Sequence, residues 1–122
     1  MTETTQTVDT RRQISRGMVA IYKEYFGRGP TRAQTTISDT HVIVILNDAL
    51  TVVEQRLAKE GNHETVRGLR RKAQESMSSD MTKLVEERTQ RTVLCLLSDH
   101  DVPTDTAVEV LVFEDAEIEE AL

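Results

Sequence analysis

The sequence predicts an α+β fold in two layers, with helices on one face of a four-stranded, mostly antiparallel sheet. Two pairs of short β-type runs are each joined by a turn, which is typical of hairpins. Longer segments with apolar residues three and four positions apart lie before the first pair and between the two pairs, which indicates helices. A chain of 122 residues has room for one core. The predicted order is α-β-β-α-α-β-β, in a single domain over residues 9–114.

The first helix is predicted over residues 9–26. It follows a polar segment, residues 1–8, that lacks periodicity and is expected to be disordered. Ile14, Met18 and Tyr22 recur at helical spacing and form one apolar stripe. A glycine after this helix can take a positive φ and end it, and a proline prevents it from continuing. The structural turn that ends the helix consists of Gly27, Gly29 and Pro30.

A hairpin and a short helix are predicted next. Residues 33–37 alternate as in a half-buried strand, and residues 41–46 form a second, β-branched strand. Thr51 and Glu54 have the spacing of a capping box, in which each side chain binds the other residue's backbone N–H. The short helix that begins there is expected to end at Gly61.

A long helix is predicted over residues 64–88. Its apolar stripe consists of Val66, Leu69, Ala73, Met77, Met81 and Leu84. Such a helix is ~38 Å long, whereas a strand of seven residues covers only ~23 Å. We therefore expect the helix to overhang its sheet and to pair with a second copy through Met77, Met81 and Leu84, giving a homodimer. The alternative is a break near Ser78 that folds the second half back and leaves a monomer.

The last two strands are predicted over residues 92–98 and 106–114. The first has an apolar run and is expected to be buried on both sides, with Cys95 as core filler. Residues 99–105 form the turn between the two strands, and residues 115–122 form an acidic tail.

The net charge of −6 is unevenly distributed. Residues 1–98 carry 15 basic and 12 acidic side chains, whereas residues 99–122 carry 9 acidic side chains and no basic one. We interpret the tail as a solvated end. The alternatives are a mask over the basic surface and a docking segment for a partner.

Composition also indicates where the protein resides. The longest apolar runs have five residues, far fewer than the roughly 20 that a membrane-spanning helix needs. The polar N-terminus does not resemble a secretory signal. The single cysteine, Cys95, fits a reducing compartment, so we expect a cytoplasmic protein.

The sequence offers no catalytic, cofactor-binding or metal-binding residues that we would assign. Its three histidines have no cysteine partner and no mutual i, i+4 spacing, which argues against zinc. The group of Asp99, His100, Asp101 and Asp105 is typical of a hairpin turn, with an opportunistic metal site as the alternative. No nucleophile elbow or phosphate-binding loop is present. We therefore expect a protein that is not an enzyme.

Basic residues are the strongest candidates for an interaction. They are Arg28, Arg67, Arg70, Arg71 and Lys72. Spacings of three and four place the three arginines of the long helix on one face. Such a face is commonly solvated and ion-paired, but it could also bind an anion, an acidic protein surface or nucleic acid. Nucleic acid is disfavoured, because the chain has only 4 aromatic residues and none lies within the cluster.

Five motifs occur in order along the chain: Tyr25-Phe26-Gly27-Arg28-Gly29-Pro30, Val42-Ile43-Val44-Ile45-Leu46, Leu50-Thr51 with Glu54, Val66-Arg67 with Arg70, and Leu97-Ser98-Asp99. Over about residues 11–114 the chain resembles the MpsC-like family, also described as DUF2294. The chain departs from the family pattern at Gln90, where a glycine is expected before Arg91.

The resemblance implies an accessory part of a sodium-translocating, membrane-potential-generating system. Together with the absence of a catalytic motif, it favours a soluble, non-enzymatic interaction subunit with a membrane-protein partner. The resemblance supplies no catalytic residues. Two alternatives remain, a regulatory domain that binds a small molecule or an anion, and a nucleic-acid-binding module.

Overall fold

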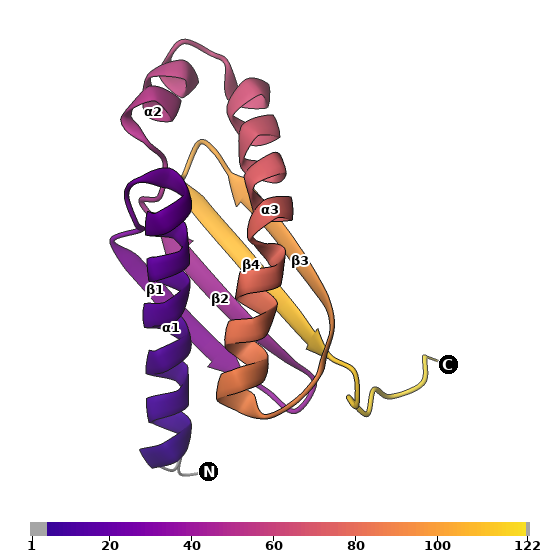
Figure 1. Ribbon diagram of the computed structural model, residues 1–122. Helices are drawn as coiled ribbons and strands as arrows, with labels where there is room; N and C mark the ends of the chain where they lie inside the picture. The colour runs from indigo at the N-terminus through magenta and orange to yellow at the C-terminus, as the bar shows by residue number, and fades with distance from the viewer. Residues whose placement is uncertain (1–4, 122) are drawn as a thin grey trace.

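Two long helices lie side by side across one face of a four-stranded sheet in the computed structural model, which describes residues 5–121 (Figure 1). The elements in chain order are α1 (Thr5–Phe26), β1 (Arg32–Ile37), β2 (His41–Asn47), α2 (Val52–Lys59), α3 (His63–Thr89), β3 (Val93–Asp101) and β4 (Thr106–Phe113). This order and the α+β class confirm the prediction. The spatial order of the strands is β1-β2-β4-β3, and each neighbouring pair is antiparallel.

The central strands, β2 and β4, divide their side chains between the two faces of the sheet. Val42 lies opposite Leu111 and Ile43 opposite Val110, and alternate residues point to opposite faces. One face packs against α1 and α3 and contains the core. Its fully buried strand residues are Val42, Val44, Leu46, Ala107, Leu111 and Phe113. The helices contribute Ile14, Met18, Tyr22, Met77, Met81 and Val85.

Helix α1 begins earlier than predicted and ends where predicted. It starts at Thr5, so the expected disorder is wrong for residues 5–8, and residues 1–4 lie outside the described part of the chain. No helix-breaking residue interrupts this polar segment, and Val8 is half-buried. Gly27 has a φ of 78°, as expected for the residue that ends the helix.

Gly29 has a different role in the same turn. It lies close to α1, because a Cβ placed on it would be 3.1 Å from both Cγ1 and the carbonyl oxygen of Val19. A glycine is therefore required at position 29 because of close packing and not because of a positive φ. Pro30 follows as a buried residue.

Helix α3 is continuous, and its overhang is covered within the chain. Residues 76–80 are helical, so the predicted break near Ser78 is wrong. Beyond the main core, Val66 packs with Leu50 and Val102, which come from the loop before α2 and the turn between β3 and β4. These loops and α2 cover the end of α3 that was predicted to pack against a second chain.

The predicted dimer surface on α3 is therefore wrong. Met77 and Met81 have no exposed surface, because they pack between α3 and the sheet. Leu84 packs against α1, where its Cδ1 would lie only 2.6 Å from a Cβ on Gly17. Met77 and Met81 are thus unavailable to a second chain, and Leu84 is half-buried against α1.

Strand β3 lies at the edge of the sheet and is not buried on both sides as predicted. Leu94 is 64% exposed and Leu97 is 59% exposed, and Cys95 is also exposed. A register shift between Val93 and Cys95 interrupts its pairing with β4. The apolar run correctly predicted a strand, but it could not reveal that one neighbour and one covering layer are missing.

Gln90 keeps the backbone conformation of the glycine expected at its position. Its φ is 58°, and its N–H donates to the carbonyl oxygen of Glu86 at 2.9 Å. The side-chain amide donates to the carbonyl oxygen of Glu87 at 2.7 Å. The turn between α3 and β3 is thus left-handed without a glycine.

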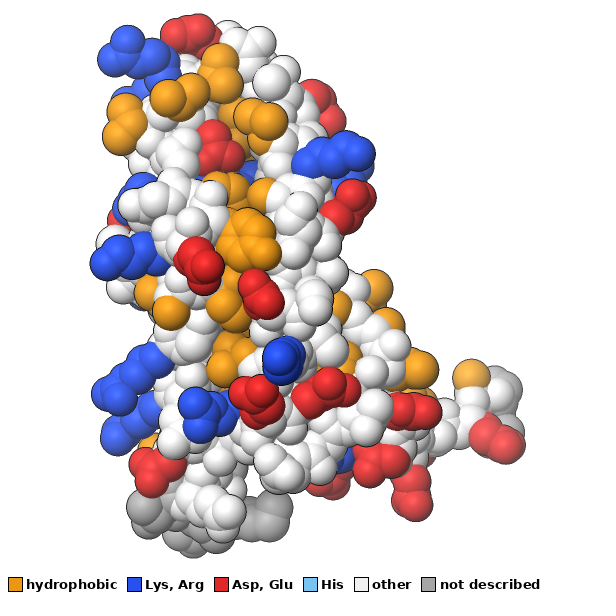
Figure 2. Space-filling model, viewed as in Figure 1, with side chains coloured by type: hydrophobic (Ala, Val, Ile, Leu, Met, Phe, Trp, Pro, Cys, Tyr) orange, Lys and Arg blue, Asp and Glu red, His pale blue; other side chains and the backbone are white. Residues whose placement is uncertain are grey.

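Charge is separated along the helix-covered side of the molecule (Figure 2). Basic side chains gather along the outer edge of α1, and acidic side chains gather near the C-terminal segment. No helix within residues 5–121 combines the length and the hydropathy needed to cross a membrane.

Candidate functional site

The sheet face opposite the helices is apolar at its centre. We call it the open sheet face and define it by seven residues: Ile43 and Ile45 of β2, Val108, Val110 and Val112 of β4, and Cys95 and Leu97 of β3. Ile45 is 42% exposed and Leu97 is 59% exposed, and the four remaining β2 and β4 residues are half-buried by their strand neighbours. Both long helices lie on the other face (Figure 1).

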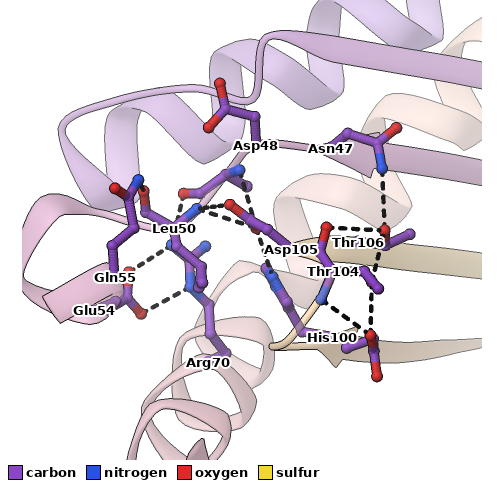
Figure 3. Close-up of polar contacts among 12 residues, drawn as sticks. Asn47, Asp48, Leu50, Glu54, Gln55, Arg70, His100, Thr104, Asp105 and Thr106 are labelled. Atoms are coloured by element: carbon purple, nitrogen blue, oxygen red, sulfur yellow. Dashed lines mark hydrogen bonds and ion pairs between the residues drawn. The ribbon is translucent and has the colours of Figure 1, made fainter. Parts of the chain in front are cut away.

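Arg70, a predicted interaction residue, is instead buried inside the fold (Figure 3). Only 1% of it is exposed. Its Nε and Nη2 donate to the two carboxylate oxygens of Glu54 at 2.8 and 2.6 Å, and Nη2 also donates to the carbonyl oxygen of Ala49 at 2.7 Å. The guanidinium lies 3.7 Å from the ring centroid of Phe26, a cation–π contact. Arg70 thus joins α3 to α2 and is unavailable to a partner.

Glu54 is charged in this pair. Burial raises the pKa of its carboxyl group, but the hydrogen bonds from Arg70 and from the backbone of Thr51 outweigh burial and lower the pKa below its ordinary value. The predicted capping box is confirmed, because the Thr51 N–H donates to Glu54 at 2.9 Å and the Glu54 N–H donates to Thr51 Oγ1 at 3.2 Å. One glutamate therefore serves both a helix cap and a buried ion pair.

The other predicted basic residues do not converge on one site. Arg28 pairs with Asp48 at 3.2 Å and donates to the carbonyl oxygen of Leu50, so it fixes the loop before α2. Arg67 lies 3.5 Å from Asp99 at the surface. Arg71 and Lys72 are exposed on α3. The three arginines therefore do not form one exposed face as predicted from their spacing, because Arg70 points into the fold while Arg67 and Arg71 are exposed.

Asp105 organises the turn between β3 and β4 (Figure 3). Its carboxylate accepts from the backbone N–H groups of Ala49 and Leu50, each at 3.1 Å, and lies 2.9 Å from His100 Nε2. Burial lowers the pKa of His100, although Asp105 opposes this shift. These contacts match the interpretation as a turn. No group of three or more His, Cys, Asp or Glu side chains in the described chain is arranged to hold a metal ion.

Glu109 in β4 has a second buried carboxyl group, which was not predicted from the sequence. It has no exposed surface, and the Tyr22 hydroxyl donates to its Oε1 at 2.6 Å. The Ser98 hydroxyl donates to its Oε2. Burial raises the pKa of Glu109 to about 7, in spite of hydrogen bonds that lower it. The alternation of β4 was a signal that could have found it, because Glu109 occupies the same face as Leu111.

These features define a two-layer α+β protein with one covered and one open sheet face, whose buried polar groups hold its elements together. The chain belongs to the MpsC family. A family model described as "Na+-translocating membrane potential-generating system (MpsC)" matches residues 6–115 and so confirms the resemblance. No curated protein and no solved structure matched the chain significantly.

Proposed function

We propose that this chain is a non-catalytic subunit of a Na+-translocating, membrane-potential-generating system, and that it acts by presenting the open sheet face to another polypeptide. The family match supports the assignment to such a system. Because that system works at a membrane, we place a membrane-embedded protein among the partners. The apolar character of the open sheet face is the observation that supports binding.

The two central strands carry mostly apolar side chains on both faces. An antiparallel sheet with one face in water normally alternates apolar and polar residues. In β2, Ile43 and Ile45 point away from the helices, while Val42 and Val44 point toward them. A contiguous apolar patch on a protein surface commonly marks an interaction site. The open sheet face therefore has the composition of a surface that another layer covers.

The anion-binding alternative loses its predicted site. Arg28 and Arg70 both bind groups of the chain itself, and Arg67 faces the carboxylate of Asp99. The two remaining cations, Arg71 and Lys72, lie on an exposed helix surface. A binding function through the open sheet face has better support.

Replacing Ile45 with glutamate tests the proposal in cells that lack the native gene. A charge buried without a partner is costly, so Ile45→Glu should abolish binding and with it the Na+-dependent membrane potential, measured with a potential-sensitive dye. Leu69→Glu is the matched control, because Leu69 is 52% exposed on α3, away from the sheet. It should restore the potential as the native chain does.

Two results would overturn the proposal. One is a native chain that makes no difference to the Na+-dependent potential. The other is an Ile45→Glu chain that restores the potential in full. Urea unfolding of the purified variant serves as the folding control, since Ile45 lies on the face opposite the helices and its replacement should leave the transition cooperative.

A further inference from the structure

We propose that a second copy of this chain covers the open sheet face, with a two-fold axis parallel to β2 and β4. This inference rests on the proposed binding role of that face and names its occupant. Side chains on this face form rows that cross the sheet at right angles to the strands. Residues directly opposite one another in neighbouring strands share a face, so the strand register defines each row.

Two apolar rows form the centre of the open sheet face. The first consists of Thr36, Ile43, Val110 and Leu97 in the order β1-β2-β4-β3. The second consists of Gln34, Ile45, Val108 and Asp99. Each row has β-branched aliphatic side chains in its middle and a different kind of side chain at each edge.

The next row carries opposite charges at its two ends. It consists of Arg32, Asn47, Thr106 and Asp101. Arg32 is exposed and forms no ion pair within the described residues 5–121. Asp101 is also exposed, and its Oδ2 accepts from the Thr104 hydroxyl at 2.6 Å, which leaves Oδ1 for another donor. The β1 edge of the face is therefore basic and the β3 edge is acidic.

A two-fold axis parallel to the strands matches these charges. Such an axis lies between two sheets packed face to face, and it exchanges the edges while it preserves the rows. Arg32 then faces Asp101 of the partner subunit, and symmetry repeats the pair. Ile45 faces Val108 of the partner subunit in the centre. Packed sheets cross at about 30°, and the length of an arginine side chain spans the offset that this angle creates at the edge.

The other face-to-face axis, perpendicular to the strands, gives a poor match. It places β3 over β3 of the partner subunit and inverts the order of the rows. The Asp99 carboxylate and its partner Arg67 would then be covered by Leu97 of the partner subunit, and Asp101 would no longer lie opposite Arg32. Covering an ion pair with an apolar side chain removes it from water, which is unfavourable. The distribution of charge thus selects the axis parallel to the strands.

The size of the face sets the expected affinity. Strands about 4.8 Å apart with a rise of about 3.4 Å per residue give a flat area of roughly 450 Å² for four strands of the length of β2. Two such faces bury about 900 Å², near the ~1,000 Å² above which interfaces are usually specific. We therefore expect a dimer that dissociates in the micromolar range rather than an obligate one.

Light scattering measures the mass of the purified chain as its concentration is raised from about 1 to 100 μM, a range that brackets a micromolar dissociation constant. The expected mass rises to twice the 13.8 kDa of one chain. Ile45→Glu should remain at the mass of one chain, and Leu69→Glu should behave as the native protein. A native mass of one chain at every concentration would overturn the second copy as occupant. If Ile45→Glu still lost the membrane potential, the proposed binding function would stand.

Thiol cross-linking tests the axis in a Cys95→Ser background. Facing strands of packed sheets lie about 10 Å apart, which is too far for a disulfide, so the test uses a bismaleimide reagent that spans about 10 Å. Mixing Arg32→Cys chains with Asp101→Cys chains should give a covalent dimer with this reagent, whereas neither variant should form one alone. A mixture that stays uncross-linked while light scattering shows dimers would overturn the axis.

Discussion

Glu54 and Glu109 are both buried glutamates, yet the pKa values of their carboxyl groups shift in opposite directions. Glu54 accepts two hydrogen bonds from a guanidinium, which stabilises the charged form and lowers its pKa. Glu109 accepts hydrogen bonds from neutral side chains and has no cation as a partner within residues 5–121, so burial dominates and its pKa rises to about 7. In this protein the guanidinium of Arg70 accounts for the main difference between the two carboxyl groups, because Glu109 has no cation as a partner in the described part of the chain.

Glu109→Gln should change how stability depends on pH. In the unfolded chain the carboxyl group ionises near its ordinary pKa of 4.5, whereas in the folded protein it keeps its proton up to about 7. The contribution of the Glu109 carboxyl group to the free energy of unfolding is therefore fully present below pH 4.5. It falls as the pH rises to about 7 and is constant above that pH. The loss is about 3 kcal/mol at most, at 1.36 kcal/mol per unit of pKa. Glutamine cannot ionise, so the variant should not lose this contribution.

Urea unfolding between pH 4.5 and pH 8 measures the difference between the two proteins. His100 has a lowered pKa and the opposite pH dependence, but both proteins retain it, so it cancels. Glu114→Gln is the control, since Glu114 is exposed one residue after β4. Curves for Glu109→Gln and the native protein that run parallel across this range would contradict the prediction.

Among the elements, those with local signals were predictable from the sequence. The capping box at Thr51 and the glycine after α1 each depend on a few neighbouring residues, and the structure confirms both. Alternation along β4 is a local signal of the same kind, and its residues divide between the two faces of the sheet accordingly. Such signals act within one turn or one strand, so the chain carries them whatever the rest of the fold does.

The inward face of α3 and the position of β3 were not predictable in the same way. The predicted stripe included Leu69, which is exposed, and omitted Arg70 and Gln74, which are buried. These polar residues can face inward only because distant residues such as Glu54 meet them, and sequence spacing does not reveal that pairing. The edge position of β3 depends likewise on β4 pairing with β2 across the chain.

Arg70→Ala tests the link between α2 and α3. The change leaves Glu54 buried without its cation, and breaking a buried ion pair typically costs about 3–5 kcal/mol. Arg71→Ala, one residue further along α3, removes an exposed side chain and should change stability by less than about 0.5 kcal/mol. Urea unfolding at pH 7 provides both values. Equal midpoints for the two variants would refute the structural role of Arg70, and the double change of Arg70 and Glu54 to alanine should cost less than the sum of the single changes.

The molecule as a whole separates its two kinds of surface and its two signs of charge. One face of the sheet is covered by helices and the other is open, and the basic edge of α1 lies far from the acidic segment (Figures 1 and 2). That segment leaves the sheet beside Arg91, which follows the C-terminal end of α3, whereas Arg67 and Lys72 lie near its N-terminal end. The described tail therefore does not mask the predicted basic cluster.

Only the first residues of the acidic tail should contribute to stability. Asp115 pairs with Arg91 at 2.7 Å, the Arg91 guanidinium lies 3.8 Å from the centroid of the Phe113 ring, and Ala116 packs against the core. Residues 117, 119 and 120 are exposed acids. Deleting residues 117–122 should leave the free energy of unfolding within about 0.5 kcal/mol of the native value. Deleting residues 115–122 should lower it by more, because this deletion also removes the exposed ion pair of Asp115 and the packing of Ala116.

Urea unfolding of the two truncated chains in low salt and in 1 M NaCl separates the ionic part of this effect. Salt screens the attraction between Asp115 and Arg91, so the difference in the free energy of unfolding between the two truncated chains should shrink as salt is added. A remainder that persists in high salt measures the packing of Ala116. Both truncations should keep the concentration-dependent mass of the full chain, because the tail leaves from the end of the sheet and not from its open face. A large loss of stability from the shorter deletion would show that the exposed acids contact the folded domain after all.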